Sequence, residues 1–283
     1  MHQILLRLLC IPMLLAAAAC GTPPARIDAL AARAGLARAT VPGAGFTHVV
    51  YTDAASTSID APIWVYIESD GTPWIDESIP ADDPTPRNPV ALPMMLEGPR
   101  PAILLGRPCY FGTASTGRCM ATWWTHRRFA PEVVDSMAGA LERAMADRGW
   151  SGRPINLVGF SGGGTLAVLM APRVERLCAV ITVASPLDLA EWTRSRGYST
   201  MQGSIDPALS TPLPERIEQL HLRGALDRVV AADNGARFRH RNPGAEFRVI
   251  PGIGHDIGWV SAWAEILRAR SGPVLQRCLR TNE

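Results

Sequence analysis

The sequence predicts an α/β fold, with a mostly parallel β-sheet, helices on both faces and no large cap domain. Three observations support this prediction. Short β-branched and apolar runs alternate with helical patterns along much of the chain. Residues 179–184 are continuously apolar, as expected of a strand buried on both faces. With 283 residues, 47% of them hydrophobic, the chain is long enough to form one large domain of this kind.

The first twenty residues have the pattern of an export signal. Arg7 closes a short positive region, residues 8–19 are largely apolar, and alanines precede Cys20. The apolar stretch is too short for a stable membrane span. We therefore expect a signal peptide over residues 1–19, a tether over 20–25 and a single α/β domain over 26–283.

The alanine-rich stretch that ends at Cys20 resembles a bacterial lipoprotein signal. This resemblance implies lipidation of Cys20, with export to the bacterial periplasm or cell envelope and attachment to a membrane through the lipid. Simple secretion with a cysteine near the new N-terminus is the alternative. The net charge of +2 is too small to indicate a nucleic-acid partner.

The cysteine count is compatible with export. Removal of the signal eliminates Cys10, and lipidation would use Cys20. The four cysteines that remain are Cys109, Cys119, Cys178 and Cys278. They allow three pairings into two disulfides. The first expectation is a Cys109–Cys119 bond closing a short loop, which would leave Cys178 to pair with Cys278; a buried free thiol at Cys178 is the alternative. No histidine lies near a cysteine pair, so we expect no metal.

The N-terminal half contains three expected strands and one long irregular stretch. A small helix is expected over 26–38, followed by β-branched and aromatic runs at 46–51 and 63–67 that predict adjacent strands. Residues 69–100 are rich in Pro, Asp and Asn, which is typical of a functional segment or lid. The next buried strand is expected at 101–105.

The C-terminal half alternates more regularly. Pro131 opens a helix with apolar residues at i, i+3/i+4 spacing. Residues 186–216 show little regular pattern and are too few for a large cap. Beyond them, expected strands at 220–224 and 246–250 alternate with helices.

A glycine-rich turn lies between an apolar run and a helical pattern. It reads Gly159-Phe160-Ser161-Gly162-Gly163. Between a strand and a helix, G-x-S-x-G is typical of a nucleophile elbow. The serine hydroxyl would then lie at a helix N-terminus, whose free N–H groups can bind an oxyanion. A merely structural Gly-rich turn is the alternative when the motif stands alone.

A serine nucleophile needs a histidine base, oriented by a carboxylate. On this fold the chain order is serine, acid, histidine. His255 directly follows a strand and a Gly-rich turn, and Asp227 follows the preceding strand. We therefore expect Ser161, Asp227 and His255 to form a catalytic triad. Asp188, which follows an earlier strand, is the alternative acid.

The chain resembles the α/β-hydrolase superfamily, and more closely a group of largely uncharacterised bacterial α/β-hydrolase lipoproteins. The segments that carry the resemblance are 64–74, 107–110, 157–164, 183–188 and 254–255. The resemblance places a second oxyanion donor in the turn after the early strand. It implies that Thr72 donates its N–H beside that of Gly162. An alternative role for Asp70 is to line the acyl pocket or to restrain this loop through hydrogen bonds.

The sequence thus predicts an exported serine hydrolase that cleaves an acyl ester through an acyl-enzyme, with no cofactor. The expected partners are a small-molecule or lipid acyl substrate and, through the N-terminal anchor, a membrane. An acyltransferase or a peptidase using the same triad is one alternative. A non-catalytic binding protein with this fold is another.

Overall fold

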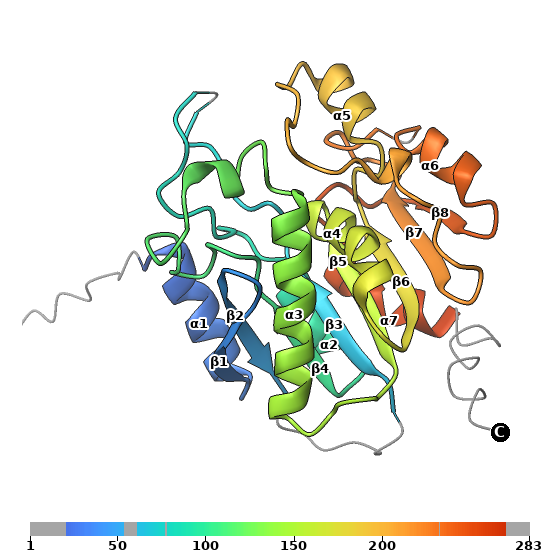
Figure 1. Ribbon diagram of the computed structural model, residues 1–283. Coiled ribbons are helices and arrows are strands. Elements are labelled where there is room, and N and C mark those ends of the chain that lie inside the picture. The colour runs from blue at the N-terminus through green and yellow to red at the C-terminus, as the bar shows by residue number, and fades with distance from the viewer. Residues whose placement is uncertain (1–20, 54–60, 77, 232, 270–283) are drawn as a thin grey trace, which may run out of the picture.

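The computed structural model describes residues 21–53, 61–76, 78–231 and 233–269 (Figure 1). The expected signal peptide, Cys20 and Cys278 lie outside these residues. Among the helices of the described ranges, none combines the length and the apolar character needed to cross a membrane.

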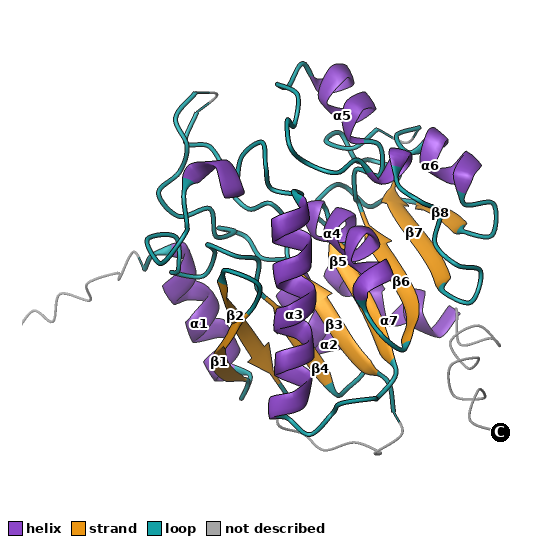
Figure 2. Cartoon of the chain, in the orientation of Figure 1, coloured by secondary structure: helices purple, strands orange, loops and turns teal. Residues whose placement is uncertain are grey.

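An eight-stranded sheet forms the centre of the molecule, in the order β1-β2-β4-β3-β5-β6-β7-β8 (Figure 2). The strands are β1 (Ala37–Pro42), β2 (Thr47–Thr52), β3 (Ile63–Ile67), β4 (Ala102–Leu105), β5 (Ile155–Phe160), β6 (Leu177–Val183), β7 (Glu218–Gly224) and β8 (Glu246–Ile250). The β1–β2 and β2–β4 pairs are antiparallel, and every other pair is parallel. The predicted mostly parallel α/β sheet is confirmed.

Helices cover both faces of this sheet. They are α1 (Pro23–Arg33), α2 (Ala91–Glu97), α3 (Pro131–Asp147), α4 (Gly162–Met170), α5 (Leu189–Arg196), α6 (Ala236–Arg241) and α7 (Trp259–Ala269). Helices α3 and α4 lie on the face turned to the viewer in Figure 1, and α2 and α7 lie on the opposite face. The central strands β3 to β6 are consequently buried along their whole length, which explains their continuous apolar runs.

Two of the N-terminal expectations are wrong. The strands at 47–52 and 63–67 are not neighbours, because β4 lies between them and pairs with both. Chain order does not determine spatial order where crossovers return a later strand to an inner position. In addition, α1 begins at Pro23, inside the expected tether, and ends at Arg33. The strand β1 that follows is mostly exposed and lacks the apolar alternation that would reveal it.

Both stretches expected to be irregular contain a short helix. Helix α2 lies within 69–100, where the carboxylate of Glu68 accepts the N–H of Leu92 at 2.9 Å. Helix α5 lies within 186–216 and is capped by Asp188, whose Oδ1 accepts the N–H of Glu191 at 2.9 Å. Side-chain acceptors of this kind satisfy the free N–H groups at a helix start. The helices are too short to show a clear period in the sequence.

The three cysteines in the described ranges are all disulfide-bonded. The expected Cys109–Cys119 bond is present. Cys178 is also disulfide-bonded, so the alternative of a free thiol at that position is wrong. The remaining cysteines lie outside the described residues.

Candidate active site

The turn between β5 and α4 holds Ser161 in an uncommon backbone conformation. Ser161 has φ 51° and ψ −124°, in the positive-φ region that non-glycine residues rarely adopt. Two backbone hydrogen bonds fix it there: its N–H donates to the Val183 carbonyl at 2.8 Å, and its carbonyl accepts the Gly164 N–H at 2.9 Å. Backbone strain of this kind persists only where the surroundings enforce it, and it concentrates at functional sites.

The two glycines of the G-x-S-x-G motif are required by close backbone approach. A Cβ on Gly159 would overlap the backbone of Gly163. A Cβ on Gly163 would overlap the carbonyl of Ile67, at the end of β3. The start of α4 therefore packs directly against the end of β3, and the loop that follows β3 lies beside the serine turn.

Ser161, Asp227 and His255 come together at the carboxyl edge of the sheet. The Nε2 atom of His255 lies 3.1 Å from Ser161 Oγ, and its Nδ1 atom lies 2.9 Å from Asp227 Oδ2. These side chains follow β5, β7 and β8 respectively, at the edge where parallel strands of open sheets gather functional groups. The arrangement can move a proton from the serine hydroxyl to the imidazole.

The imidazole of His255 is held in place but remains accessible. Trp259 Nε1 donates to the His255 carbonyl at 2.8 Å, and the Phe160 ring packs against the imidazole with centroids 5.4 Å apart. The side chain of His255 is 17% exposed, whereas that of Asp227 is 1% exposed. A reactant can therefore reach the base, while the acid behind it is shielded from water.

Hydrogen bonds around Asp227 stabilise the ionised form of its carboxyl. Its Oδ1 accepts the N–H groups of Val229 and Val230 at 2.8 and 2.9 Å. Burial raises the pKa of the carboxyl, but the hydrogen bond from His255 and these two N–H groups outweigh it, so the pKa is lowered from its ordinary value. An ionised Asp227 favours the tautomer with a proton on Nδ1, which leaves Nε2 of His255 free to accept one.

The alternative acid, Asp188, lies in a different environment. Besides capping α5, its carboxylate forms a two-point ion pair with Arg237, with Nε at 2.6 Å and Nη2 at 2.5 Å. Within the described residues it makes no hydrogen bond to His255. Asp188 joins α5 to α6 and takes no part in the arrangement around Ser161.

Backbone N–H groups near Ser161 differ in their availability. Gly162 occupies the first position of α4, where no helical acceptor precedes it. In the turn after β3, however, Thr72 donates its N–H to the Pro84 carbonyl at 2.9 Å. The N–H that was expected to bind an oxyanion is thus engaged within the protein.

The backbone N–H groups on either side of Asp70 are engaged within the protein. Ser69 donates to Glu68 Oε2 at 3.3 Å, and Gly71 donates to Ser69 Oγ at 3.2 Å. Over the described ranges, the N–H of Asp70 has no acceptor. A Cβ on Gly162 would overlap the carboxylate of Asp70, so these two residues lie directly against each other. Unlike the N–H of Thr72, that of Asp70 is free to donate to a bound oxyanion.

Two arginines that sequence reasoning missed bind the carboxylate of Asp70. Arg107 Nη1 pairs with Oδ1, and Arg128 Nη1 lies 2.9 Å from Oδ2. Burial raises the pKa of Asp70, but the charges of Arg128 and Arg107 outweigh it and lower the pKa below its ordinary value. Arg107 lies in one of the segments that carry the resemblance, but nothing in the sequence pairs it with Asp70.

Exposed aliphatic side chains lie next to the acid and the base in the chain. Leu226 precedes Asp227 and is 63% exposed, and Ile257 lies two residues after His255 and is 73% exposed. Their two loops are joined, because the Leu226 N–H donates to the Ile253 carbonyl at 2.9 Å. The rim on this side of the site thus offers apolar surface.

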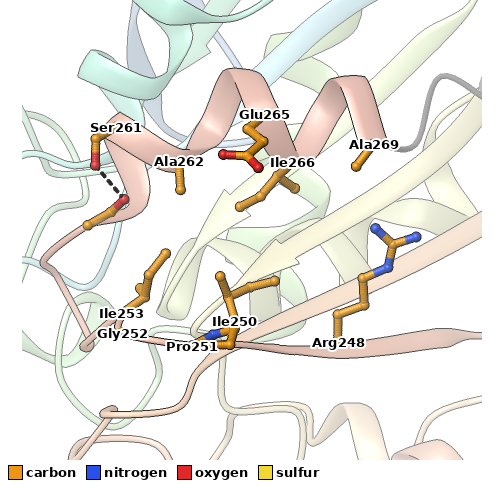
Figure 3. Close-up of a pocket in the computed structure, with 11 residues that line it drawn as sticks. Arg248, Ile250, Pro251, Gly252, Ile253, Ser261, Ala262, Glu265, Ile266 and Ala269 are labelled. Atoms are coloured by element: carbon orange, nitrogen blue, oxygen red, sulfur yellow. Dashed lines mark hydrogen bonds between the residues drawn. The ribbon is translucent and has the colours of Figure 1, made fainter.

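A separate hollow lies between β8 and α7 (Figure 3). Its volume is about 530 Å³, and residues from Arg248 to Ala269 line it. None of Ser161, Asp227 and His255 is among the lining residues. In the part of the chain that the structure describes, no group of three or more His, Cys, Asp or Glu side chains could hold a metal ion.

Comparison with solved structures identifies the fold of the chain. No protein-family model matches the sequence, and no curated protein is similar to it in sequence. A lidless α/β serine hydrolase from Xanthomonas campestris is 16% identical, with a TM-score of 0.50, covering 87% of this chain and 94% of its own. A Pyrococcus furiosus esterase is 14% identical, with a TM-score of 0.56 and coverages of 87% and 94%. This protein has the α/β-hydrolase fold.

A larger protein shares the same fold over part of its length. A puromycin-hydrolysing peptidase from Mycobacterium tuberculosis is 16% identical, with a TM-score of 0.58. The match covers 87% of this chain but 40% of the peptidase. The chain therefore corresponds to one part of that protein.

Proposed function

We propose that this protein is a serine hydrolase that cleaves acyl esters through an acyl-enzyme. The observation that carries the proposal is the continuous hydrogen-bonded series from Asp227 through His255 to Ser161. Serine, base and acid are each within hydrogen-bond reach of the next, and the base is oriented by a buried carboxylate. Several proteins with this fold are hydrolases, which agrees with the proposal.

In the first half of the reaction, Ser161 Oγ attacks the acyl carbonyl while Nε2 of His255 takes the hydroxyl proton. Asp227 stabilises the imidazolium that results. The carbonyl oxygen becomes an oxyanion, and the N–H groups of Gly162 and Asp70 are proposed to bind it. His255 then gives its proton to the leaving alkoxide, and the acyl group remains on Ser161.

In the second half, water replaces the leaving group. His255 Nε2 takes a proton from the water as it attacks the acyl-enzyme. Collapse of the second tetrahedral intermediate returns the proton to Ser161 Oγ and releases the carboxylic acid. Every proton transfer uses the same imidazole nitrogen, and the side chain of His255 is partly exposed to the reactants.

The exposed aliphatic rim favours an ester with an apolar acyl or alcohol group. Leu226 and Ile257 adjoin the acid and the base in the chain. Their exposed side chains would contact the apolar group of a bound ester. The same triad could serve an acyltransferase or a peptidase, and product analysis with an added alcohol and a peptide panel would identify either.

The test is turnover of a chromogenic ester and of a matched peptide by wild type beside Ser161→Ala. We expect ester hydrolysis by wild type and loss of at least about 10³-fold in the variant, because the nucleophile is removed. Equal ester turnover by both proteins would contradict the proposal. Turnover of the peptide alone would identify a peptidase.

We further propose that the protein is exported and lipid-anchored at Cys20. The Cys109–Cys119 disulfide supports export, since such bonds persist in oxidising compartments. The test is expression of the full chain in bacteria, followed by fractionation. Wild type is expected with the membranes, and Cys20→Ala is expected to be released from them or to stay unprocessed. Wild type in the cytosolic fraction would contradict export.

A further inference from the structure

The buried ion cluster of Asp70, Arg107 and Arg128 is a costly feature to build beside the proposed site. The side chains are 12%, 1% and 9% exposed respectively. Burying charged groups carries a large desolvation penalty, and replacing such clusters by apolar residues is often neutral or stabilising. Stability alone is therefore a poor reason for these residues, whereas fixing the position of a backbone group is a better one.

The two arginines reach Asp70 from two different loops. Arg107 follows the end of β4, and its guanidinium stacks on the rings of Tyr110 and Phe129, with centroids 5.0 and 5.5 Å away. Arg128 lies in the loop before α3, where its Nε donates to the Thr125 carbonyl at 2.6 Å. Arg107 Nη2 also donates to the Arg128 carbonyl at 3.2 Å, which joins the two loops.

Asp70 is held at its backbone as well as at its side chain. The Tyr110 hydroxyl donates to the Asp70 carbonyl at 3.0 Å. Two guanidinium groups and one phenol thus fix both ends of the residue. On its other side the carboxylate touches Gly162, the residue after the nucleophile. A shift of Asp70 would move its free N–H relative to that of Gly162.

We propose that Arg107 and Arg128 are positioning residues for the oxyanion hole, which hold Asp70 so that its N–H and that of Gly162 bind the same oxygen. The inference rests on the proposed hydrolase function. It assigns the two arginines no contact with the substrate. The two arginines are expected to act on the transition state, where the oxyanion develops. Interactions that the bound substrate and the transition state share should not change.

The test compares full-length wild type with Arg128→Gln and the matched control Arg127→Gln. Arg127 is the neighbouring residue, but its guanidinium pairs with Glu132 at 2.6 Å and stacks on Trp123, away from Asp70. The measurements are kcat and KM for a chromogenic ester, inhibition by an alkylboronic acid that mimics the tetrahedral intermediate, and the thermal midpoint.

For Arg128→Gln we expect kcat to fall about 10- to 100-fold, somewhat less than the loss of a whole oxyanion donor. KM should stay within about threefold, and the boronic acid should bind more weakly by a factor similar to the loss in kcat/KM. Arg127→Gln should match wild type within about twofold. Folded Arg128→Gln with unchanged kcat and boronic acid affinity would overturn the inference, as would a loss confined to KM.

If Arg128→Gln does not fold, Tyr110→Phe tests the same role of the contacts around Asp70. This variant removes one hydroxyl and keeps every charge, so we expect a smaller fall in kcat, about three- to tenfold, again with unchanged KM. Unchanged kcat in folded Tyr110→Phe would overturn the inference in that case. Wild type that hydrolyses no ester and binds no boronic acid would overturn the proposed function itself, whereas active wild type with unaffected variants overturns only the role of the arginines.

Discussion

Nε2 of His255 lies 3.1 Å from Oγ of Ser161, although 94 positions separate these residues in the chain. The contact exists because β5 and β8 are parallel strands of one sheet and end at the same edge. Ser161 is further brought forward by a backbone conformation that the neighbouring glycines permit. We therefore expect different effects from substitutions at the acid, in the turn that holds Ser161 and in the loops around them.

Replacing the acid should reduce the rate without unfolding the protein. Asp227→Asn preserves size and the acceptor for Val229 and Val230, but an amide favours the wrong imidazole tautomer and cannot stabilise the imidazolium. We expect kcat for an ester to fall about 10³- to 10⁴-fold with little change in thermal midpoint.

Asp188→Asn is the matched control for that variant. It removes the charge that pairs with Arg237 and keeps a side chain able to cap α5. Activity within about threefold of wild type is expected, because the ion pair lies outside the hydrogen-bonded series. If Asp188→Asn were the inactive variant and Asp227→Asn the active one, the acid would have been assigned incorrectly.

The second glycine of the motif should tolerate no side chain. Gly163→Ala places a methyl group against the carbonyl of Ile67, and neither backbone can move without shifting β3 or α4. We expect a loss of about 3 kcal/mol or more in the free energy of unfolding, or no soluble protein. In Gly244→Ala the methyl group meets no atom within 4 Å, so a change below about 1 kcal/mol is expected by urea denaturation. Similar losses in both variants would contradict the close packing.

Glu68 should make stability depend on pH. Burial raises its pKa from 4.5 to about 7, against the opposing hydrogen bonds from Leu92, Val90 and Ser69. The folded protein therefore holds this proton more tightly than the unfolded chain does. Stability from this group is greatest below pH 4.5, falls as the pH rises toward about 7 and is level above that.

The measurement is urea denaturation of wild type and Glu68→Gln across pH 4 to 9, with the two free energies subtracted at each pH. Subtraction removes the titrations that both proteins share. Relative to the variant, wild type should lose up to about 3 kcal/mol over this interval, at about 1.4 kcal/mol per unit at most. A difference that is constant with pH would show that folding does not change the pKa of Glu68.

The Cys109–Cys119 bond should contribute to stability through the unfolded chain. It joins residues ten positions apart and so limits the freedom of that loop after unfolding. The double variant Cys109→Ser, Cys119→Ser is expected to lose about 2–3 kcal/mol, measured by urea denaturation without reductant. Addition of a reductant to wild type should produce at least this loss, because the bond at Cys178 is reduced as well. Insensitivity to both changes would contradict this account.

Much of this site could be predicted from sequence because its motifs are local. Ser161 lies in a five-residue pattern between a strand and a helix, and His255 follows a strand and a Gly-rich turn. The parallel sheet was predictable from apolar runs such as β6, which only a doubly covered strand requires.

The rest depends on contacts between distant segments. Asp70 is held by residues 37 and 58 positions away, and no pattern along the chain records which loops will meet. The engagement of the Thr72 N–H by Pro84 is likewise a property of the folded loop. The predicted strand order was wrong for the same reason, since the position of β4 between β2 and β3 is fixed by packing across the sheet.

The central claim is that Ser161 is a nucleophile activated by His255, and labelling with a fluorophosphonate tests it most directly. The probe reacts with activated serines, and mass spectrometry after digestion locates the adduct. We expect one adduct, on Ser161, with labelling abolished in Ser161→Ala and strongly slowed in His255→Ala. Folded wild type that stays unlabelled, or Ser161→Ala that is labelled as fast as wild type, would contradict the account.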